Sequence, residues 1–307
     1  MTSDRTTLVA FSDQLADAVA EGARSMVAVH GRLRLPSTGI HWRDGVVVTT
    51  EATVRRDSDL SVTLPDGRNI PATLAGRDPG TDLAALRIAP GELPVAELGD
   101  PAGLRPGHLV LALARLGDGA PRAAFGAVSA TAGRWRCWKG GQIDLLLQSD
   151  LTLYPGFGGG PLVNAAGEVV GINSGGLSRP LATTIPTGTV DRVLDQLLHR
   201  GFVARGWLGA AMQPVRFSAA ARERLGLEQA GGLVLLSVEP DAPAASAGLL
   251  VGDVIVGLDG RPMEHPDTVL ELLAGEAIGK TIAADLVRGG ARTRAELRIG
   301  ERPRRER

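Results

Sequence analysis

Between residues 25 and 186 the chain is a succession of short apolar runs, each closed by glycine, proline, asparagine or aspartate. Examples are GVVVTTEATV, DLAALRI, HLVLALARL and IDLLLQSD, and no long helical pattern separates them. Spacing of this kind is typical of antiparallel barrels. Asp66–Gly67 lies between two such runs and predicts the turn of a β-hairpin. We therefore expect a mainly β protein whose first part is an all-β barrel.

The composition agrees with a turn-rich protein that has an aliphatic interior. The chain of 307 residues contains 41 glycines and 19 prolines, whereas aromatic residues make up 3%. This length has room for two domains, each with its own core. The formal net charge is -1, so the chain as a whole attracts neither nucleic acid nor anionic lipid.

Helical patterns bound the strand-rich part, and the pattern changes again near residue 205. Ser12 and Asp13 precede apolar residues at helical spacing, and a second amphipathic helix is expected over 188–201, with Gly201 as its stop. From about residue 205, strands alternate with short helices in a compact α+β module. The expected organisation is a helical segment at 1–24, a barrel domain at 25–202, a small domain at 205–300 and a basic tail at 301–307.

Cysteine usage and hydropathy suggest where the protein acts. Cys137 is the single cysteine, so no intrachain disulfide forms. No apolar run is long enough to span a membrane, and the N-terminal stretch is too interrupted for a signal peptide. We therefore expect a cytoplasmic protein without a membrane partner, and we expect no metal and no cofactor.

Four segments resemble a known family. The stretch GGLVLLSVEPDAPAASAGLLVGDVIVGLDGRPM resembles the signature of a PDZ domain of the bacterial protease-associated type. Before it, DGVVVTTEATV, LPDGRNIPATLAGRDPGTDLAALRI and YPGFGGGPLVNAAGEVVGINSGG resemble, in order, three segments of the HtrA/Deg serine protease family. The resemblance runs from Ala16 to Gly300. It implies a chymotrypsin-like double β-barrel followed by a small α+β PDZ domain; an unrelated barrel would need all four segments to match by chance.

The family's catalytic triad can be compared position by position. Asp82 in GTDLAAL matches the family's aspartate, but Ala52 stands at the histidine position and Gly158 at the serine position. Loss of either residue costs a triad enzyme about 10⁶-fold in turnover. This predicts a pseudoprotease that is not an enzyme. Because Glu51 and Thr53 also depart from the family pattern, we favour natural replacement over a laboratory change.

Other residues are weak substitutes for the missing groups. His41 is the least remote histidine, and we expect a structural role for it. Ser149 and Ser174 flank the glycine-rich loop, but neither occupies its tip. Without a histidine, Asp82 is expected to bond to backbone amides or to the hydroxyls of nearby threonines, namely Thr49, Thr50 and Thr53.

Two backbone features are candidate peptide-binding sites. In active relatives the amides of the loop matching Gly156, Phe157 and Gly158 form the oxyanion hole; here they either still bind carbonyls or carboxylates, or have collapsed. In the second module the resemblance implies a carboxylate-binding loop at Trp207, Leu208, Gly209 and Ala210.

The sequence offers alternative residues for the wall opposite that loop. Val269 and Leu273, or Leu272 in place of the latter, are candidates on the helix of the second module, with core packing as the alternative. Trp207 serves equally well as a packing residue.

The sequence thus predicts a catalytically inactive HtrA-like protein that binds peptides, protein C-termini or unfolded segments. It would act as a scaffold, chaperone-like factor or regulator in protein quality control. The alternative is an active serine endopeptidase with non-standard catalytic residues. The resemblance also implies a homo-oligomer, typically a trimer, or co-assembly with an active relative. Trp135 and Trp138 lie among basic residues, but the neutral charge favours a hairpin tip or subunit contact over nucleic-acid binding.

Overall fold

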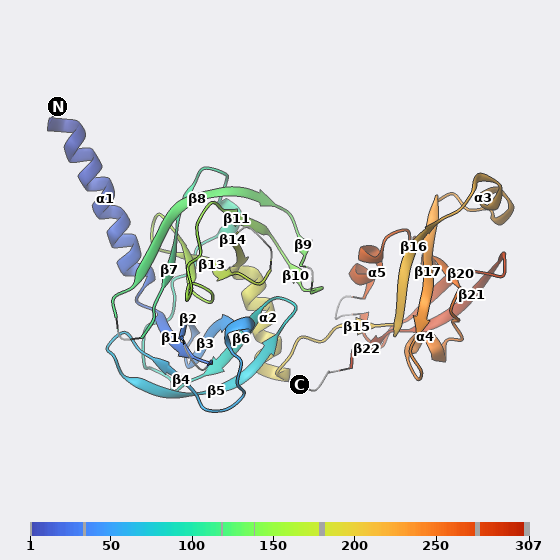
Figure 1. The fold of residues 1–307 in the computed structure, drawn as a ribbon, viewed down its shortest axis with the longest axis horizontal. Helices are drawn as coiled ribbons and strands as arrows, with labels where there is room; N and C mark the ends of the chain where they lie inside the picture. Colours follow the sequence, from blue (N-terminus) through green and yellow to red (C-terminus); the bar gives the residue numbers. More distant parts are fainter. Residues whose placement is uncertain are drawn as a thin grey trace. The chain divides into compact units, whose positions relative to one another are not determined.

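The computed structural model describes residues 2–32, 35–117, 119–137, 139–177, 182–273 and 277–303. The chain divides into two compact units, Met1–Val203 and Ala204–Arg307 (Figure 1). Each unit has its own apolar core.

The first unit contains two closed six-stranded barrels, as the double-barrel prediction requires. The order of the first barrel is β1-β2-β3-β6-β5-β4. Its strands are β1 (Met26–His30), β2 (Ser37–Arg43), β3 (Val46–Thr50), β4 (Leu60–Thr63), β5 (Asn69–Asp78) and β6 (Leu83–Arg87). The predicted hairpin joins β4 to β5, and Gly67 in its turn has a φ of 87°, which favours glycine.

The second barrel follows the order β11-β14-β13-β12-β7-β8. Its strands are β7 (Leu109–Ala114), β8 (Arg122–Ala132), β11 (Leu146–Ser149), β12 (Pro161–Asn164), β13 (Val169–Ser174) and β14 (Ala182–Pro186). Two short strands, β9 (Trp135–Arg136) and β10 (Gln142–Ile143), form a separate hairpin. Two short 3-10 turns, η1 (Glu51–Thr53) and η2 (Pro101–Gly103), interrupt the connections between strands.

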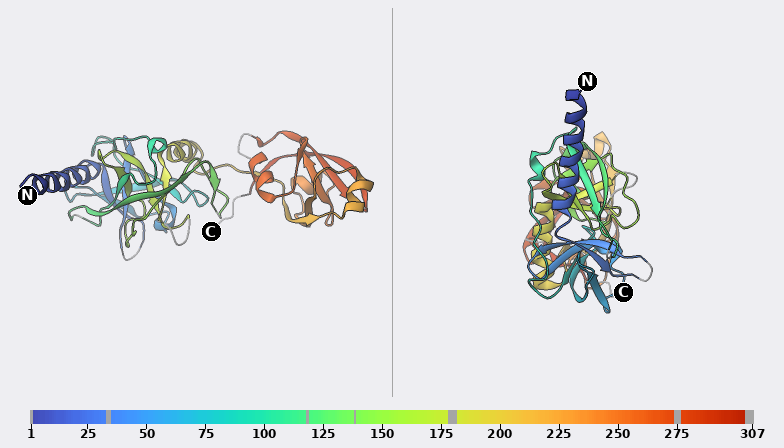
Figure 2. Two further views of the ribbon diagram at one scale, coloured as in Figure 1. Left: turned by 90° about the horizontal axis from the view of Figure 1, so that it is seen from above. Right: turned by 90° about the vertical axis from the view of Figure 1, so that its left-hand side faces the viewer.

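Helix α1 (Thr2–Gly22) begins ten residues before the predicted position, so the expected cap at Ser12 and Asp13 is wrong. Ala18 is buried where α1 packs on β7 and β12, whereas Leu8 and Phe11 are exposed. Figures 1 and 2 show α1 running away from the barrels. Residues 6–14 of this helix are exposed, so no pattern of buried apolar residues marks its first half.

Helix α2 (Thr187–Arg200) was predicted almost correctly from its apolar face. Its buried side chains are Val190, Val193, Leu194 and Leu197, and it ends at Gly201 in the left-handed conformation, with a φ of 77°. It contacts β5 and β6 of the first barrel and β13 and β14 of the second. The helix therefore ties the two barrels into one unit.

The described residues of the second unit form a main antiparallel sheet, a separate two-stranded sheet and three short helices. The main sheet follows the order β16-β17-β18-β20-β21, with β19 paired to β18, so β16 lies at its edge; β15 pairs with β22 in the separate sheet. The strands are β15 (Gly206–Trp207), β16 (Ala210–Arg216), β17 (Gly231–Val238), β18 (Val254–Leu258), β19 (Arg261–Pro262), β20 (Thr281–Arg288), β21 (Ala291–Arg298) and β22 (Gly300–Glu301). The helices are α3 (Ala219–Leu225), α4 (Pro243–Ser246) and α5 (Pro266–Leu272).

None of the helices that the described residues form combines the length and apolar character needed to cross a bilayer.

Candidate active-site cleft and candidate peptide groove

One cleft of about 830 Å³ in the first unit contains the three positions compared with the family's triad. Ala52 lies in η1 directly after β3, Asp82 precedes β6, and Gly158 lies in the loop before β12. Strands β3 and β6 are paired, with Thr50 opposite Leu83, and this pairing sets Ala52 beside Asp82. The barrel architecture thus brings together residues that lie far apart in the sequence.

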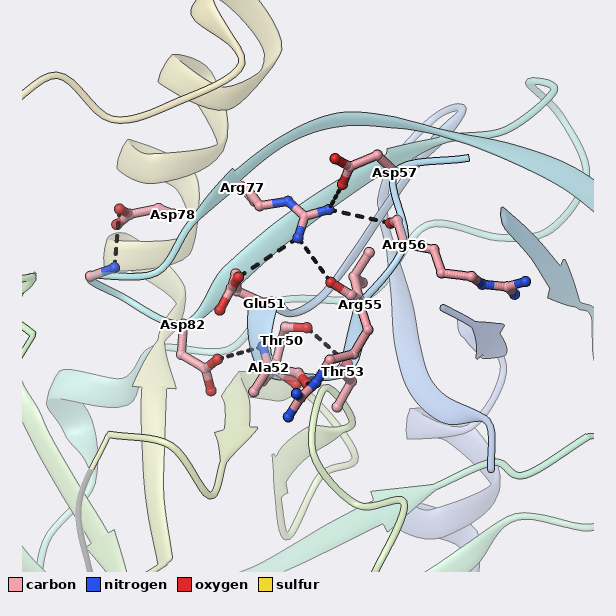
Figure 3. A network of polar contacts seen from close by, with 12 residues as sticks. Thr50, Glu51, Ala52, Thr53, Arg55, Arg56, Asp57, Arg77, Asp78 and Asp82 are labelled. Carbon is pink, nitrogen blue, oxygen red and sulfur yellow. Dashed lines mark hydrogen bonds and ion pairs between the residues drawn. The ribbon is translucent and has the colours of Figure 1, made fainter. Parts of the chain in front are cut away.

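Asp82 is held by two donors. The backbone N–H of Ala52 donates to its Oδ1 at 2.9 Å (Figure 3). The hydroxyl of Ser174 donates to its Oδ2 at 2.6 Å. The residue is 1% exposed, and this burial raises the pKa of the Asp82 carboxyl above its ordinary value. The backbone amide was among the expected partners, but the hydroxyl comes from Ser174 and not from a threonine.

The threonines instead bond to one another and to the backbone. Thr53 donates its hydroxyl hydrogen to the carbonyl oxygen of Thr50 at 2.8 Å. Because a hydroxyl carries one hydrogen, Thr50 is the donor in its 3.1 Å bond to Thr53 Oγ1. Thr49 donates to the carbonyl oxygen of Thr38 at 2.7 Å. Three hydroxyls are thereby fixed in position next to the cleft.

Position 158 faces this threonine network. A Cβ added to Gly158 would lie 3.5 Å from Thr50 Oγ1 and 3.8 Å from Thr53 Cγ2, which are ordinary contacts. Among the described residues that line the cleft there is no serine and no histidine. His41 is buried elsewhere: its Nδ1 donates to the carbonyl oxygen of Pro94 at 3.1 Å and its Nε2 accepts from Gly45 at 3.1 Å.

In the glycine-rich stretch 156–160 of the loop before β12, two amides have no acceptor among the described residues. The N–H of Phe157 donates to Tyr154, and the N–H of Gly159 donates to Asn173. Neither the N–H of Gly156 nor that of Gly158 has an acceptor in the described part of the chain. Two unpaired amides, one on each side of a paired one, form an arrangement that can receive a carbonyl or carboxylate oxygen.

Three cationic side chains also line this cleft, and sequence reasoning missed them. Arg55 follows η1, Arg32 follows β1, and Lys139 belongs to the β9–β10 connection. They come from three separate loops, so only the closed barrels place them around one cavity.

In the second unit, the predicted carboxylate-binding loop lies at the open edge of the sheet. The carbonyl oxygens of Leu208 and Gly209 accept from Ala244 at 2.8 Å and Glu239 at 2.7 Å, which fixes the loop. The N–H groups of these same two loop residues have no acceptor within the described ranges. Gly209 has a φ of 72°, and a Cβ there would overlap with that of Ala242.

Helix α5 packs beside β16 and contributes mainly to the core. Val269 is 2% exposed and Leu273 is 8% exposed, and both belong to the core that includes Leu208. Leu272 is partly buried against the same core, and Trp207 is also partly buried. Of the tryptophan pair, Trp135 packs against the first unit's core, and Trp138 lies outside the described residues.

Comparisons with known families agree with this architecture. Residues 37–172 match the trypsin-like peptidase domain, and residues 206–299 match the PDZ domain. The chain is 35% identical over 266 residues to a probable periplasmic serine endoprotease DegP-like from Pseudomonas fulva, covering 85% of this chain and 54% of that protein. The counterpart from Halomonas elongata is 32% identical over 283 residues, covering 89% and 57%.

Solved structures are similar along nearly the whole chain. The HtrA-type protease AlgW with tripeptide has a TM-score of 0.75 and 30% identity, covering 95% of this chain and 98% of that one. The serine endoprotease from Yersinia pestis has a TM-score of 0.76 and 27% identity, covering 94% and 98%.

The fold and the cleft define a trypsin-like peptidase double barrel joined to a PDZ domain. This chain belongs to the HtrA-type family of serine proteases. It spans about half the length of the curated relatives that it matches.

Two expectations are corrected by these comparisons. The relatives are named serine endoproteases and the structural neighbours HtrA-type proteases, which contradicts the expectation, based on Ala52 and Gly158, that the chain is not an enzyme. The relatives are also named periplasmic, so the expected cytoplasmic location is wrong. The lack of a disulfide does not distinguish the two compartments, because a core of this size is stable in either.

Proposed function

We propose that this HtrA-type chain binds polypeptides at two places: a C-terminal end in the PDZ groove and an extended segment in the barrel cleft. The observation that carries the proposal is the pair of unpaired backbone amides at each place. These are Leu208 and Gly209 in the groove, and Gly156 and Gly158 in the cleft. Amides without an acceptor are suited to carbonyl and carboxylate oxygens, which every peptide provides.

In the PDZ groove the peptide adds as a further strand along the open edge of β16. Its terminal carboxylate lies on the amides of Leu208 and Gly209, where a side chain at position 209 would obstruct it. Partly buried Trp207, Ala210 and Leu272 are the nearest candidates for contacts with the peptide side chains. Val269 and Leu273 support this wall from the core. The HtrA-type protease AlgW has been solved with a decapeptide and with a tripeptide, which supports peptide binding in this family.

A binding measurement tests the groove. Fluorescence anisotropy with a labelled peptide library should show binding to free C-termini that is lost when the C-terminus is amidated. Gly209→Ala should remove this binding, because its added methyl group overlaps with Ala242. Gly260→Ala is the matched control: its φ of 75° imposes the same backbone strain, but its Cβ meets no atom within 4 Å. Equal binding by both variants would reject the groove.

Capture at the two places suits a protein that holds unfolded chains in protein quality control, as a chaperone-like factor, a scaffold or a regulator. A trimer, or co-assembly with a related protease, is proposed from the family resemblance alone. Light scattering on the full chain gives its mass in solution and tests the trimer.

Peptide-bond hydrolysis is the second candidate function, favoured by the names of the relatives and by the amides of Gly156 and Gly158. Such amides stabilise the oxyanion of an acyl-transfer intermediate. With glycine at position 158, the attacking group must be another hydroxyl or a water molecule. The hydroxyl of Thr50 is the nearest polar side-chain group to that position, and Asp82 is the carboxylate in the same cleft.

Hydrolysis is tested with a fluorogenic peptide library on the full chain, using a DegP-like relative as the positive control. If Thr50 or Asp82 takes part in the reaction, turnover should fall by at least about a hundredfold in Thr50→Val or Asp82→Asn. Turnover that is unchanged in both variants would exclude these two residues. The binding proposal does not depend on this result.

A further inference from the structure

We infer that the barrel cleft binds a carboxylate of its polypeptide ligand, between the unpaired amides of the 156–158 loop and the guanidinium groups of Arg32 and Arg55. The inference rests on the proposed function, in which this cleft receives a polypeptide. It adds the chemical class of the ligand, which is a carboxylate-bearing segment and not a neutral or basic one.

The charge of the cleft lining favours an anion. Arg32, Arg55 and Lys139 all line it, and Asp82 is the one carboxylate among its described lining residues. Asp82 is 1% exposed, and both of its oxygens already accept hydrogen bonds. The positive charges of the lining therefore exceed the negative charge, and the negative charge is the more deeply buried.

The two arginines keep donors available for a ligand. Arg55 donates through Nε to the carbonyl oxygen of Ala52 at 3.3 Å. Arg32 donates through Nε to Leu35 at 2.7 Å and more weakly, at 3.5 Å, to Pro36. Neither arginine forms an ion pair with any residue that the structure describes. A guanidinium has five N–H donors arranged as a fork that matches a carboxylate.

A neighbouring arginine shows the contrast. Arg77, which lies just behind η1, forms ion pairs with Asp57 and with Glu51 and also donates to two backbone carbonyls (Figure 3). Its charge is satisfied within the protein. Arg55 follows η1, whereas Arg77 lies in β5; the side chain of Arg55 bonds to a single carbonyl and lines the cavity, so its charge remains available to a ligand.

The amide donors lie in this same cleft. Gly156 and Gly158 line it together with both arginines, and the hydroxyls of Thr50 and Thr53 add polar surface. Backbone amides and guanidinium groups are all hydrogen-bond donors. A ligand group that is purely a hydrogen-bond acceptor can therefore bond to the largest number of these donors. In a polypeptide the ionised group of this kind is a carboxylate, either on an aspartate or glutamate side chain or at the C-terminus.

Fluorescence anisotropy with the full chain tests the inference. Three short peptides, acetylated and amidated so that no terminal carboxylate is present, differ only in central Glu, Gln or Lys residues. The Glu peptide should bind about tenfold or more tightly than the Gln peptide, and the Lys peptide should bind most weakly. The combined variant Arg32→Gln and Arg55→Gln should reduce binding of the Glu peptide about tenfold while leaving the Gln peptide unchanged.

A fourth peptide, neutral with a free C-terminus, distinguishes the two sources of the carboxylate. If its binding also weakens in the double variant, the cleft takes terminal carboxylates as well as side-chain ones. Arg105→Gln is the matched control, because this exposed arginine of the same unit lies outside the cleft lining. Thermal melts of all variants confirm that they are folded.

The outcomes separate this inference from the proposed function. Measurable and equal binding of the Glu and Gln peptides would overturn the inference and leave the proposed function standing. Binding of none of the three amidated peptides would overturn both the inference and the cleft part of the proposed function. A preference for Glu that persists in the double variant would show that other groups provide the selectivity, and would also overturn the inference.

Discussion

Two adjacent glycines in the loop before β12 should respond in opposite ways to the same substitution. Gly159 has a φ of 88°, and a Cβ there would overlap with the carbonyl oxygen of Thr38 and the hydroxyl of Thr49. Gly158 has no such φ, and its added Cβ would make only ordinary contacts, at 3.5 Å from Thr50 Oγ1 and 3.8 Å from Thr53. Alanine should therefore be tolerated at position 158 and not at position 159.

The magnitudes follow from these contacts. At position 159, alanine incurs roughly 1–2 kcal/mol for the left-handed backbone. It also breaks the buried 2.7 Å bond from Thr49 to Thr38, which costs about 1–3 kcal/mol more because the partners are left unsatisfied. A total of about 2–5 kcal/mol lowers the melting temperature of a unit of this size by roughly 5–15 °C. At position 158, alanine should change stability by less than about 1 kcal/mol, with a small gain from reduced freedom of the unfolded chain.

Differential scanning calorimetry of the full chain measures both variants under the same conditions. The two units need not unfold together, so the transition of the second unit serves as an internal reference that neither substitution should move. Equal losses of stability in Gly158→Ala and Gly159→Ala would refute the argument, since it depends on the different surroundings of the two Cβ positions.

Three further predictions follow from the buried groups. Burial raises the pKa of Asp82, so its contribution to folding is favourable below about pH 4 and is lost as the pH rises. From about pH 4 to neutral pH, the free energy of unfolding of Asp82→Asn, measured by urea titration, should therefore increase relative to that of the parent. A difference between the two proteins that is constant with pH would contradict this. Hydrogen bonds from Arg288 hold the pKa of Asp253 below its usual range, so this contribution is present above about pH 4 and is lost on acidification. Arg288→Gln should therefore lower the melting temperature of the second unit at neutral pH and lower it less in acid, and an equal loss at both pH values would contradict this. A Cβ on Gly76 would press on the backbone of Gly201, at 2.5 Å from its carbonyl oxygen, so Gly76→Ala should lower the melting temperature of the first unit by several degrees, and an unchanged melt would argue against this contact.

The strand-rich barrel part and the α+β pattern of the second module were predictable because their signals are local, whereas the double barrel and the PDZ domain followed from the resemblance of four segments to a known family. Alternation and turn residues mark each strand, and the helix over 188–201 shows its apolar stripe directly. The start of α1 was missed for the opposite reason: Leu8 and Phe11 are exposed, so its first turns leave no burial pattern in the sequence.

The chemistry of the cleft was only partly predictable. Asp82 was identified from its segment, but its partner Ser174 lies on a strand of the other barrel and only the fold brings the two together. The same holds for Arg32 and Arg55, which are unremarkable in the sequence because each belongs to a different loop. The argument from Ala52 and Gly158 concerned only the serine–histidine–aspartate mechanism. It does not address catalysis by other hydroxyls or by a water molecule that the folded cleft positions.

The open edge of β16 also carries a safeguard against the protein's own association. An unpaired strand edge can pair with the same edge of another molecule and so begin an aggregate. Pro214 lies within this strand, is exposed and has no N–H, and prolines in sheets are found where the missing donor would face the open side. A strand added along β16 therefore meets a gap in its ladder at that residue. The edge thus leaves room for the short terminal segment that we propose to bind near residues 207–210, but it resists the long pairing that fibril growth requires.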